Sequence, residues 1–181
     1  MQIMEENKYL KKEIEKQKNA YLSDKRCTLL TSRFNNKTLS ENRNYKNKKN
    51  LGCIYCSPCP ISVSIPSESI MFILEMNNDK NMIEGIGMVR NKAYVNKYNV
   101  YEDGNYNRYV FVGNNFIDRK MMNEKEELVM KAFDILCFKG NNHMKRGQGL
   151  KQFPTRLLFN ASKKIDLVDF VKDMFKRRMT K

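Results

Sequence analysis

The middle of the chain alternates between apolar and polar residues with a period of two, the pattern of half-buried strands. This alternation, rich in aromatic and β-branched side chains, predicts strands at 61–65, 69–76, 82–90, 94–101 and 106–112. The separators at 77–81 and 102–105 are rich in Asn, Asp and Gly, which favour tight turns. Short strands joined by tight turns favour antiparallel pairing, so we expect a meander or a small antiparallel β-barrel.

Two helices are predicted after these strands. Asn123 is the expected N-cap of the first, Gly140 ends it, and its predicted buried stripe is Leu128, Ala132 and Ile135. Asp166 caps the second, whose predicted apolar face is Val171, Met174 and Phe175. Strands followed by flanking helices indicate the α+β class.

A heptad pattern runs through residues 3–21, with seam positions Ile3, Asn7, Leu10, Ile14, Gln17 and Tyr21. Glu6 and Glu13 occupy g positions, and Lys11 and Lys18 occupy the e positions that would meet them in a parallel dimer. The segment therefore predicts an N-terminal helix, either a short coiled coil that forms a homodimer or a single solvated helix.

Residues 33–50 contain six basic residues, one acidic residue and almost no large apolar side chain. This composition is typical of a basic linker. We therefore expect an N-terminal helix over 1–32, a basic linker over 33–50 and a globular α+β domain over 51–181.

The net charge of +14 is unevenly distributed along the chain. Residues 1–50 carry 13 Lys/Arg against 6 Asp/Glu, residues 51–138 carry 9 against 11, and residues 139–181 carry 12 against 3. Basic ends around a slightly acidic middle indicate an anionic partner, either nucleic acid or an anionic membrane surface. Charge alone does not choose between them. No apolar run approaches the about 18 residues of a membrane span, and we expect nucleic acid, RNA or DNA, as the partner and no membrane.

The glycine-rich segment 140–151 is the strongest candidate site. Its glycines free the backbone to present N–H groups to a phosphate, beside His143, Lys145, Arg146, Gln148 and Lys151. The alternative is a surface loop whose charges only keep the protein soluble. Further candidates for contact with bases or phosphates are Arg108, Tyr109, Lys176, Arg177 and Arg178.

Cys53, Cys56 and Cys59 have the spacing of zinc ligands, with Cys27, Cys137 or His143 as alternatives for a fourth. No second Cys-x-x-Cys pair is present, so we favour free thiols and expect neither metal nor cofactor. Five cysteines, an odd number, fit a reducing compartment.

Catalytic signatures are scarce. The chain has one histidine, no phosphate-binding Walker loop and no nucleophile elbow, which argues against an enzyme. Gly85 and Gly87 open no helix, so we expect them to be close-packing points within a strand.

The motifs Cys53-Ile-Tyr-Cys56, Phe72-Ile-Leu-Glu75, Asn107-Arg108-Tyr109 and His143-Met-Lys145-Arg146-Gly147-Gln-Gly149 resemble a family of mostly uncharacterised proteins of nucleocytoplasmic large DNA viruses. This resemblance covers about half of the chain and implies action inside an infected cell, in the host cytoplasm or nucleus, or packaging in the virion. A weaker likeness at the level of the fold is to PUA-like modules, small β-barrels that include RNA-binding domains.

These observations together predict a non-enzymatic nucleic-acid-binding protein of a large DNA virus, with RNA the first candidate ligand. The alternative is a virion or scaffold protein that assembles through its N-terminal helix and basic arm.

Overall fold

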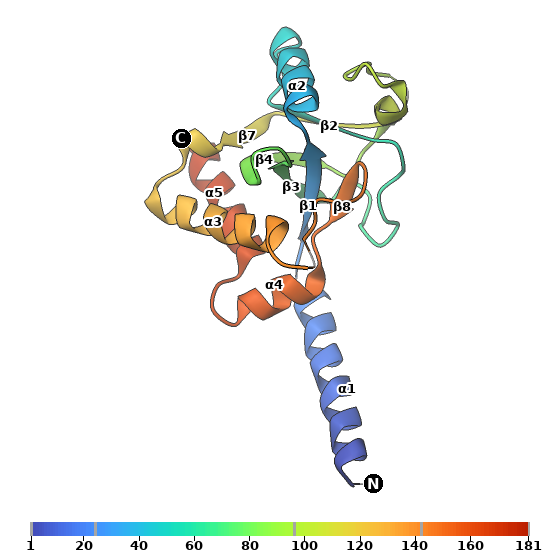
Figure 1. Ribbon diagram of the computed structural model, residues 1–181, viewed down its shortest axis with the longest axis vertical. Helices are drawn as coiled ribbons and strands as arrows, with labels where there is room; N and C mark the ends of the chain where they lie inside the picture. Colours follow the sequence, from blue (N-terminus) through green and yellow to red (C-terminus); the bar gives the residue numbers. More distant parts are fainter. Residues whose placement is uncertain (1, 24, 96, 142, 181) are drawn as a thin grey trace.

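A five-stranded mixed sheet forms the centre of the fold (Figure 1). The computed structural model describes residues 2–23, 25–95, 97–141 and 143–180. In sheet order the strands are β7 (Asn115–Asp118), β4 (Met82–Arg90), β3 (Ile70–Asn77), β1 (Cys27–Phe34) and β8 (Leu150–Gln152). Strands β1 and β3 run parallel and all other neighbours are antiparallel. The predictions for β3 and β4 are confirmed, whereas the expected purely antiparallel pairing is wrong.

A second, three-stranded sheet contains β2 (Cys53–Ser57), β6 (Tyr109–Gly113) and β5 (Tyr94–Val95). It packs against one face of the larger sheet, where Tyr55 and Phe111 meet Met71 and Ile73 in a shared core. Both sheets stay open across the residues that the structure describes, so the predicted barrel does not form. The α+β class is confirmed.

Three predicted strands are shorter or absent, and in the third of them, 106–112, strand β6 begins only at Tyr109. Residues 61–65 form a turn in which the Ile65 N–H donates to the Ser62 carbonyl, and of residues 94–101 only β5 is a strand. The Asn107 side chain explains the second difference, because its Oδ1 accepts from the backbone N–H groups of Val100 and Tyr101. A side-chain amide thus takes the place of a neighbouring strand.

Three helices cover the opposite face of the large sheet: α3 (Glu124–Phe138), α4 (Thr155–Ser162) and α5 (Leu167–Met179) (Figure 1). Alternation along β3 directs Phe72 and Leu74 toward these helices and Ile73 toward the small sheet. Phe72 stacks on Phe175 of α5 with ring centroids 5.1 Å apart. The predicted Asp166 cap and apolar face of α5 are both confirmed.

The predicted cap of α3 is correct, but its predicted buried stripe is wrong. Asn123 and Glu126 form a capping box, and Gly140 follows the helix with a positive φ of 79°. Leu128 and Ile135 are 65% and 54% exposed. The buried apolar residues are Val129, Met130, Phe133 and Cys137. Successive residues of a helix are about 100° apart, so residues next to the predicted stripe lie on a different face of the helix. The face that docks on the sheet carries the bulkier Met130 and Phe133.

The predicted linker over 33–50 is the end of β1 followed by helix α2 (Asn36–Lys48). Asn35 caps this helix in a reciprocal box with Thr38. Buried Asn42 donates from Nδ2 to the Ile54 carbonyl of β2 at 2.7 Å. The linker prediction is wrong because composition concealed a helix cap, and residues 27–48 belong to the folded structure that precedes Leu51.

A buried ion pair joins α2 to the central sheet. Arg43 donates through both terminal nitrogens to the carboxylate of Glu75, which is fully buried on β3. The Tyr55 hydroxyl donates to the same carboxylate at 2.8 Å. The Arg43 guanidinium also lies 4.6 Å from the ring centroid of Phe116. One carboxylate therefore connects a helix and both sheets.

Gly85 and Gly87 are the predicted close-packing points. A Cβ atom on Gly87 would lie 2.1 Å from the Tyr55 hydroxyl oxygen, and one on Gly85 would lie 2.5 Å from the Phe116 ring. Both glycines point to the same face of β4, because they are two residues apart in a strand. They let the aromatic rings lie directly on the sheet.

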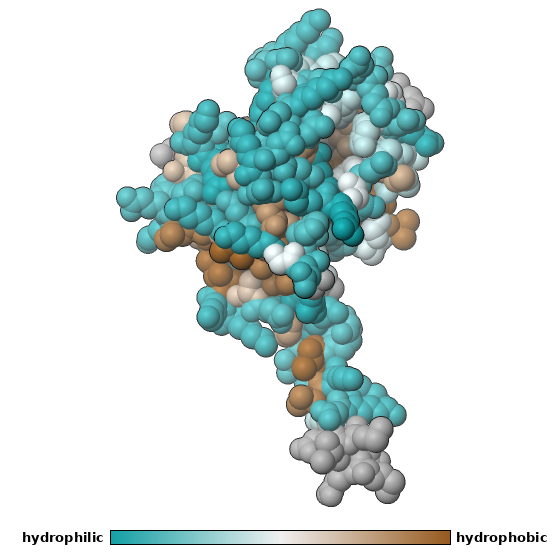
Figure 2. Space-filling view, viewed as in Figure 1, coloured by the Kyte–Doolittle hydropathy of each residue, from teal (hydrophilic) through white to brown (hydrophobic). Residues whose placement is uncertain are grey.

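The N-terminal helix α1 (Gln2–Ser23) projects away from the body and contacts it only near its end (Figure 1). There Tyr21 packs on Phe159 of α4, with ring centroids 6.0 Å apart. Leu10 and Ile14 are 59% and 47% exposed, and apolar surface is visible along the projecting part (Figure 2). The presence of an N-terminal helix is confirmed, but its predicted extent to residue 32 is wrong, since α1 ends at Ser23 and residues 27–32 lie in β1. No helix within the described ranges combines the length and apolar character needed to cross a membrane.

Candidate nucleic-acid interface

The basic charge is concentrated in residues 139–165, which contain seven Lys/Arg and no Asp or Glu. We call this stretch the acid-free segment. Six of the seven cations are exposed and Lys145 is half-buried. None of them forms an ion pair with any described residue. Their charges therefore face solvent without local compensation.

The glycine loop (residues 140–149) is attached to the body through its backbone. The Arg33 Nε donates to the Met144 carbonyl at 2.5 Å, and the Asn78 Nδ2 donates to the Lys145 carbonyl at 3.1 Å. The Met144 N–H donates to the Cys137 carbonyl of α3 at 2.7 Å. Three contacts on two consecutive residues fix the path of the loop, so Lys145 and Arg146 extend from a defined backbone.

Gly149 brings the end of this loop against the small sheet. Its φ is +64°, and a Cβ there would lie 2.3 Å from the Ser57 Oγ. Ser57 is the register partner of Tyr109, and the exposed Arg108 lies 5.9 Å from the Tyr109 ring centroid. The structure thus places Arg108 and Tyr109, predicted from a distant part of the sequence, on the same flank as the glycine loop.

The remaining candidates of this region follow the loop. Lys151 is exposed on β8, an edge strand that pairs only with β1 among the described strands. Gln148 is exposed, and His143 is half-buried with a buried Nδ1 atom that has no partner in the described part of the chain. Of the predicted residues in this stretch, Arg146, Gln148 and Lys151 are exposed, and His143 and Lys145 are half-buried.

The basic end of α5 behaves differently from this surface. Arg177 and Arg178 donate to the Glu126 carboxylate at 3.0 Å and 2.7 Å, and Lys176 lies 3.7 Å from Asp173. Glu126 is buried, so these arginines attach α5 to α3. The structure therefore separates Lys176, Arg177 and Arg178 from the glycine loop and pairs all three with carboxylates.

The Glu126 pair predicts a pH-dependent stability. Hydrogen bonds from Arg178 lower the pKa of Glu126 to about 2. Because the folded pKa is below the unfolded value, the stabilisation is complete above about pH 4.5 and is lost as the pH falls toward 2. We expect Glu126→Gln to reduce the free energy of unfolding at pH 7 by on the order of 3 kcal/mol. Denaturant titrations should show this deficit shrinking below pH 4.5. Glu124→Gln, on the exposed first turn, should show none.

The cysteines of the Cys-x-x-Cys motif lie on strand β2 and beyond it. Cys53 and Cys56 are three residues apart, so they point to opposite faces of the strand and belong to different core clusters. Burial raises the pKa of Cys53 and of Cys137 to about 12. Within the described residues, no group of three or more metal-binding side chains comes together.

Two residues that hold the loop, Arg33 and Asn78, were missed by the sequence reasoning. Arg33 was assigned to the linker, and Asn78 to a turn. A signal for Arg33 was present, since Cys27–Phe34 is a short run of apolar and β-branched residues before an Asn-x-x-Thr cap. Asn78 had no comparable signal, because its partner carbonyl is 67 residues away.

Similarity to known proteins adds nothing to this geometry: comparison with protein-family models, curated proteins and solved structures finds no match in any of the three.

Proposed function

We propose that the protein is a non-enzymatic nucleic-acid-binding protein, with RNA the first candidate ligand, and that the glycine loop and the acid-free segment form its interface. The observation that carries this proposal is the set of seven cations in a segment without acidic residues, none of which forms an ion pair within the described residues. Phosphate contacts by such cations release condensed counterions, which supplies most of the non-specific affinity for nucleic acid.

Contacts with bases are expected at the flank beside the loop. Arg108 and the half-buried ring of Tyr109 lie there, and exposed aromatic and guanidinium planes stack on unpaired bases. Single strands present such bases, so we propose a preference for single-stranded over double-stranded ligands.

The test is a titration of fluorescently labelled single- and double-stranded RNA and DNA with the full chain at several salt concentrations. We expect binding that weakens linearly in a plot of log affinity against log salt, with single-stranded RNA bound best. Absence of binding to all four ligands at low salt would refute the proposal.

The second candidate function is assembly through α1, and the exposure of its seam favours it. A lone helix with Leu10 and Ile14 open to water gains little stability, because tertiary packing supplies most helix stability in proteins. A second copy of α1 would cover these residues and place Glu13 near Lys18 of the partner. The basic arm that this alternative also predicted is not a flexible segment, since residues 36–48 form helix α2.

We expect Leu10→Ala/Ile14→Ala to convert a concentration-dependent dimer into a species of the 21.5 kDa chain mass, because the double variant removes the seam. Sedimentation velocity over a range of concentrations measures this. Lys12→Ala/Lys16→Ala is the matched control, since it alters the same helix outside the seam. A wild type that is monomeric at every concentration would contradict the assembly function and leave nucleic-acid binding untouched.

A further inference from the structure

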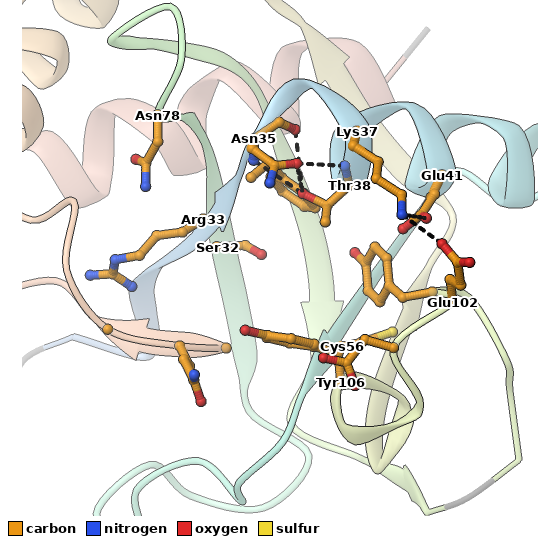
Figure 3. Close-up of a pocket in the computed structure, with 16 residues that line it drawn as sticks. Ser32, Arg33, Asn35, Lys37, Thr38, Glu41, Cys56, Asn78, Glu102 and Tyr106 are labelled. Atoms are coloured by element: carbon orange, nitrogen blue, oxygen red, sulfur yellow. Dashed lines mark hydrogen bonds and ion pairs between the residues drawn. The ribbon is translucent and has the colours of Figure 1, made fainter.

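A cavity of about 540 Å³ opens beside the glycine loop (Figure 3). It lies beyond the carboxyl ends of the parallel strands β1 and β3, between the start of α2, the residues 101–106 and the glycines Gly147 and Gly149. Its volume is within the range of roughly 300–1,000 Å³ typical of small-molecule sites. Ligands of sheets with parallel strands bind outside these strand ends.

One end of the cavity offers hydrogen-bond donors to an anion. Arg33 and Asn78 lie together there (Figure 3). Arg33 makes no ion pair with a described residue, its Nη1 is buried without a partner, and burial lowers the pKa of its guanidinium. The Asn78 Nδ2 already donates to the Lys145 carbonyl, so Arg33 supplies the donors at this end. A partly buried guanidinium without a carboxylate beside it is costly, and an anion at this end of the cavity would compensate its charge.

The opposite end combines aromatic rings with carboxylates. Tyr106 packs edge-on against Tyr101 with ring centroids 6.3 Å apart. The Lys37 Nζ lies 2.6 Å from Glu102 and 4.0 Å from Glu41, so one cation faces two acids (Figure 3). This end therefore offers a stacking surface and hydrogen-bond acceptors, the complement of an amino-bearing ring.

We propose that this cavity binds one nucleotide of the bound strand, with its phosphate at Arg33 and an amino-bearing base against Tyr106. Adenine, cytosine and guanine carry exocyclic amino groups that Glu41 and Glu102 can accept from, and uracil carries none. The inference rests on the proposed function, because Arg33 and Asn78 also hold the backbone of Lys145 and its neighbour. The glycine loop then contacts the adjoining phosphates while the cavity holds the nucleotide.

Calorimetric titration of the full chain with nucleoside 5′-monophosphates, the matching nucleosides and inorganic phosphate tests the inference. We expect GMP, AMP and CMP to bind more tightly than UMP, and each more tightly than its nucleoside. Arg33→Gln should weaken monophosphate binding about tenfold or more and leave nucleoside binding unchanged, because only the charge-assisted phosphate bonds are lost. Competition by inorganic phosphate alone would identify the Arg33 end as the anion subsite.

Two further variants keep the result interpretable. Tyr106 is half-buried, so Tyr106→Ala should preserve the fold. It should weaken the binding of nucleosides and of monophosphates equally. Lys145→Ala/Arg146→Ala should weaken the binding of nucleic-acid strands but not the binding of monophosphates. If the wild type binds nucleic-acid strands but no monophosphate, only the cavity inference is overturned. If it binds monophosphates but no strand, only the loop interface is overturned. Equal weakening of nucleoside and monophosphate by Arg33→Gln would assign Arg33 only to loop attachment and reject the phosphate subsite.

Discussion

Replacing Lys145 and Arg146 together by alanine is expected to reduce the affinity for nucleic acid strongly without unfolding the protein. Each phosphate contact contributes about 0.9 to the salt slope on duplexes and about 0.7 on single strands, so the slope should fall by about 1.8 or 1.4. A slope of about 1.8 means that two duplex contacts raise the affinity about 60-fold when the salt concentration falls from 1 M to 0.1 M. Titration of labelled strands at several salt concentrations measures both quantities.

The control variant for this experiment is Lys125→Ala/Lys131→Ala. These two lysines are exposed on α3, outside the acid-free segment, so the net charge changes equally. If binding depends on total charge alone, the two double variants will lose equal affinity and the glycine loop will have no special role. A larger loss at Lys145 and Arg146 supports a fixed interface, since the backbone of that loop is held by Arg33 and Asn78.

The Arg43→Ala substitution is expected to lower the free energy of unfolding by about 3–5 kcal/mol, the usual cost of leaving a buried charge unpaired. The Glu75 carboxylate is fully buried, and among the described residues it would keep only the Tyr55 hydroxyl as a hydrogen-bond partner. Domain stabilities are typically about 5–15 kcal/mol, so much of the total would be lost. The midpoint of a urea titration measures this loss, and the helical signal of α2 should be lost first.

A double variant separates the pair from simple packing. In Arg43→Met/Glu75→Leu both charges are absent, and apolar pairs of similar volume often match or exceed a buried ion pair in stability. We therefore expect the double variant to recover part of the loss, since the buried Tyr55 hydroxyl still loses its acceptor at Glu75. Glu102→Ala removes the exposed partner of Lys37 and should cost at most about 1 kcal/mol. A loss of similar size in Arg43→Ala would mean that α2 is held by other contacts.

Local signals in the sequence were sufficient for the elements whose stability is local. The apolar runs of β3 and β4, the Asn123 box and the Asp166 cap involve neighbours within a few residues, so they are readable without the fold. The concentration of charge near the C-terminus was also readable, because it is a property of composition. The glycine loop was therefore found from the sequence, although its attachment was not.

Long-range contacts decided the rest. Strand β1 lies inside the sheet because it pairs with β3 on one side and β8 on the other. Arg43 of helix α2 pairs with Glu75 on β3, 32 residues away. The pairing of Arg178 with Glu126, 52 residues apart, determined which cations are compensated and which face solvent. Composition records how many charges a chain has, whereas only tertiary packing determines which of them meet. For this reason the sequence alone located the basic segment, and the structure alone identified Arg33 and the cavity beside it.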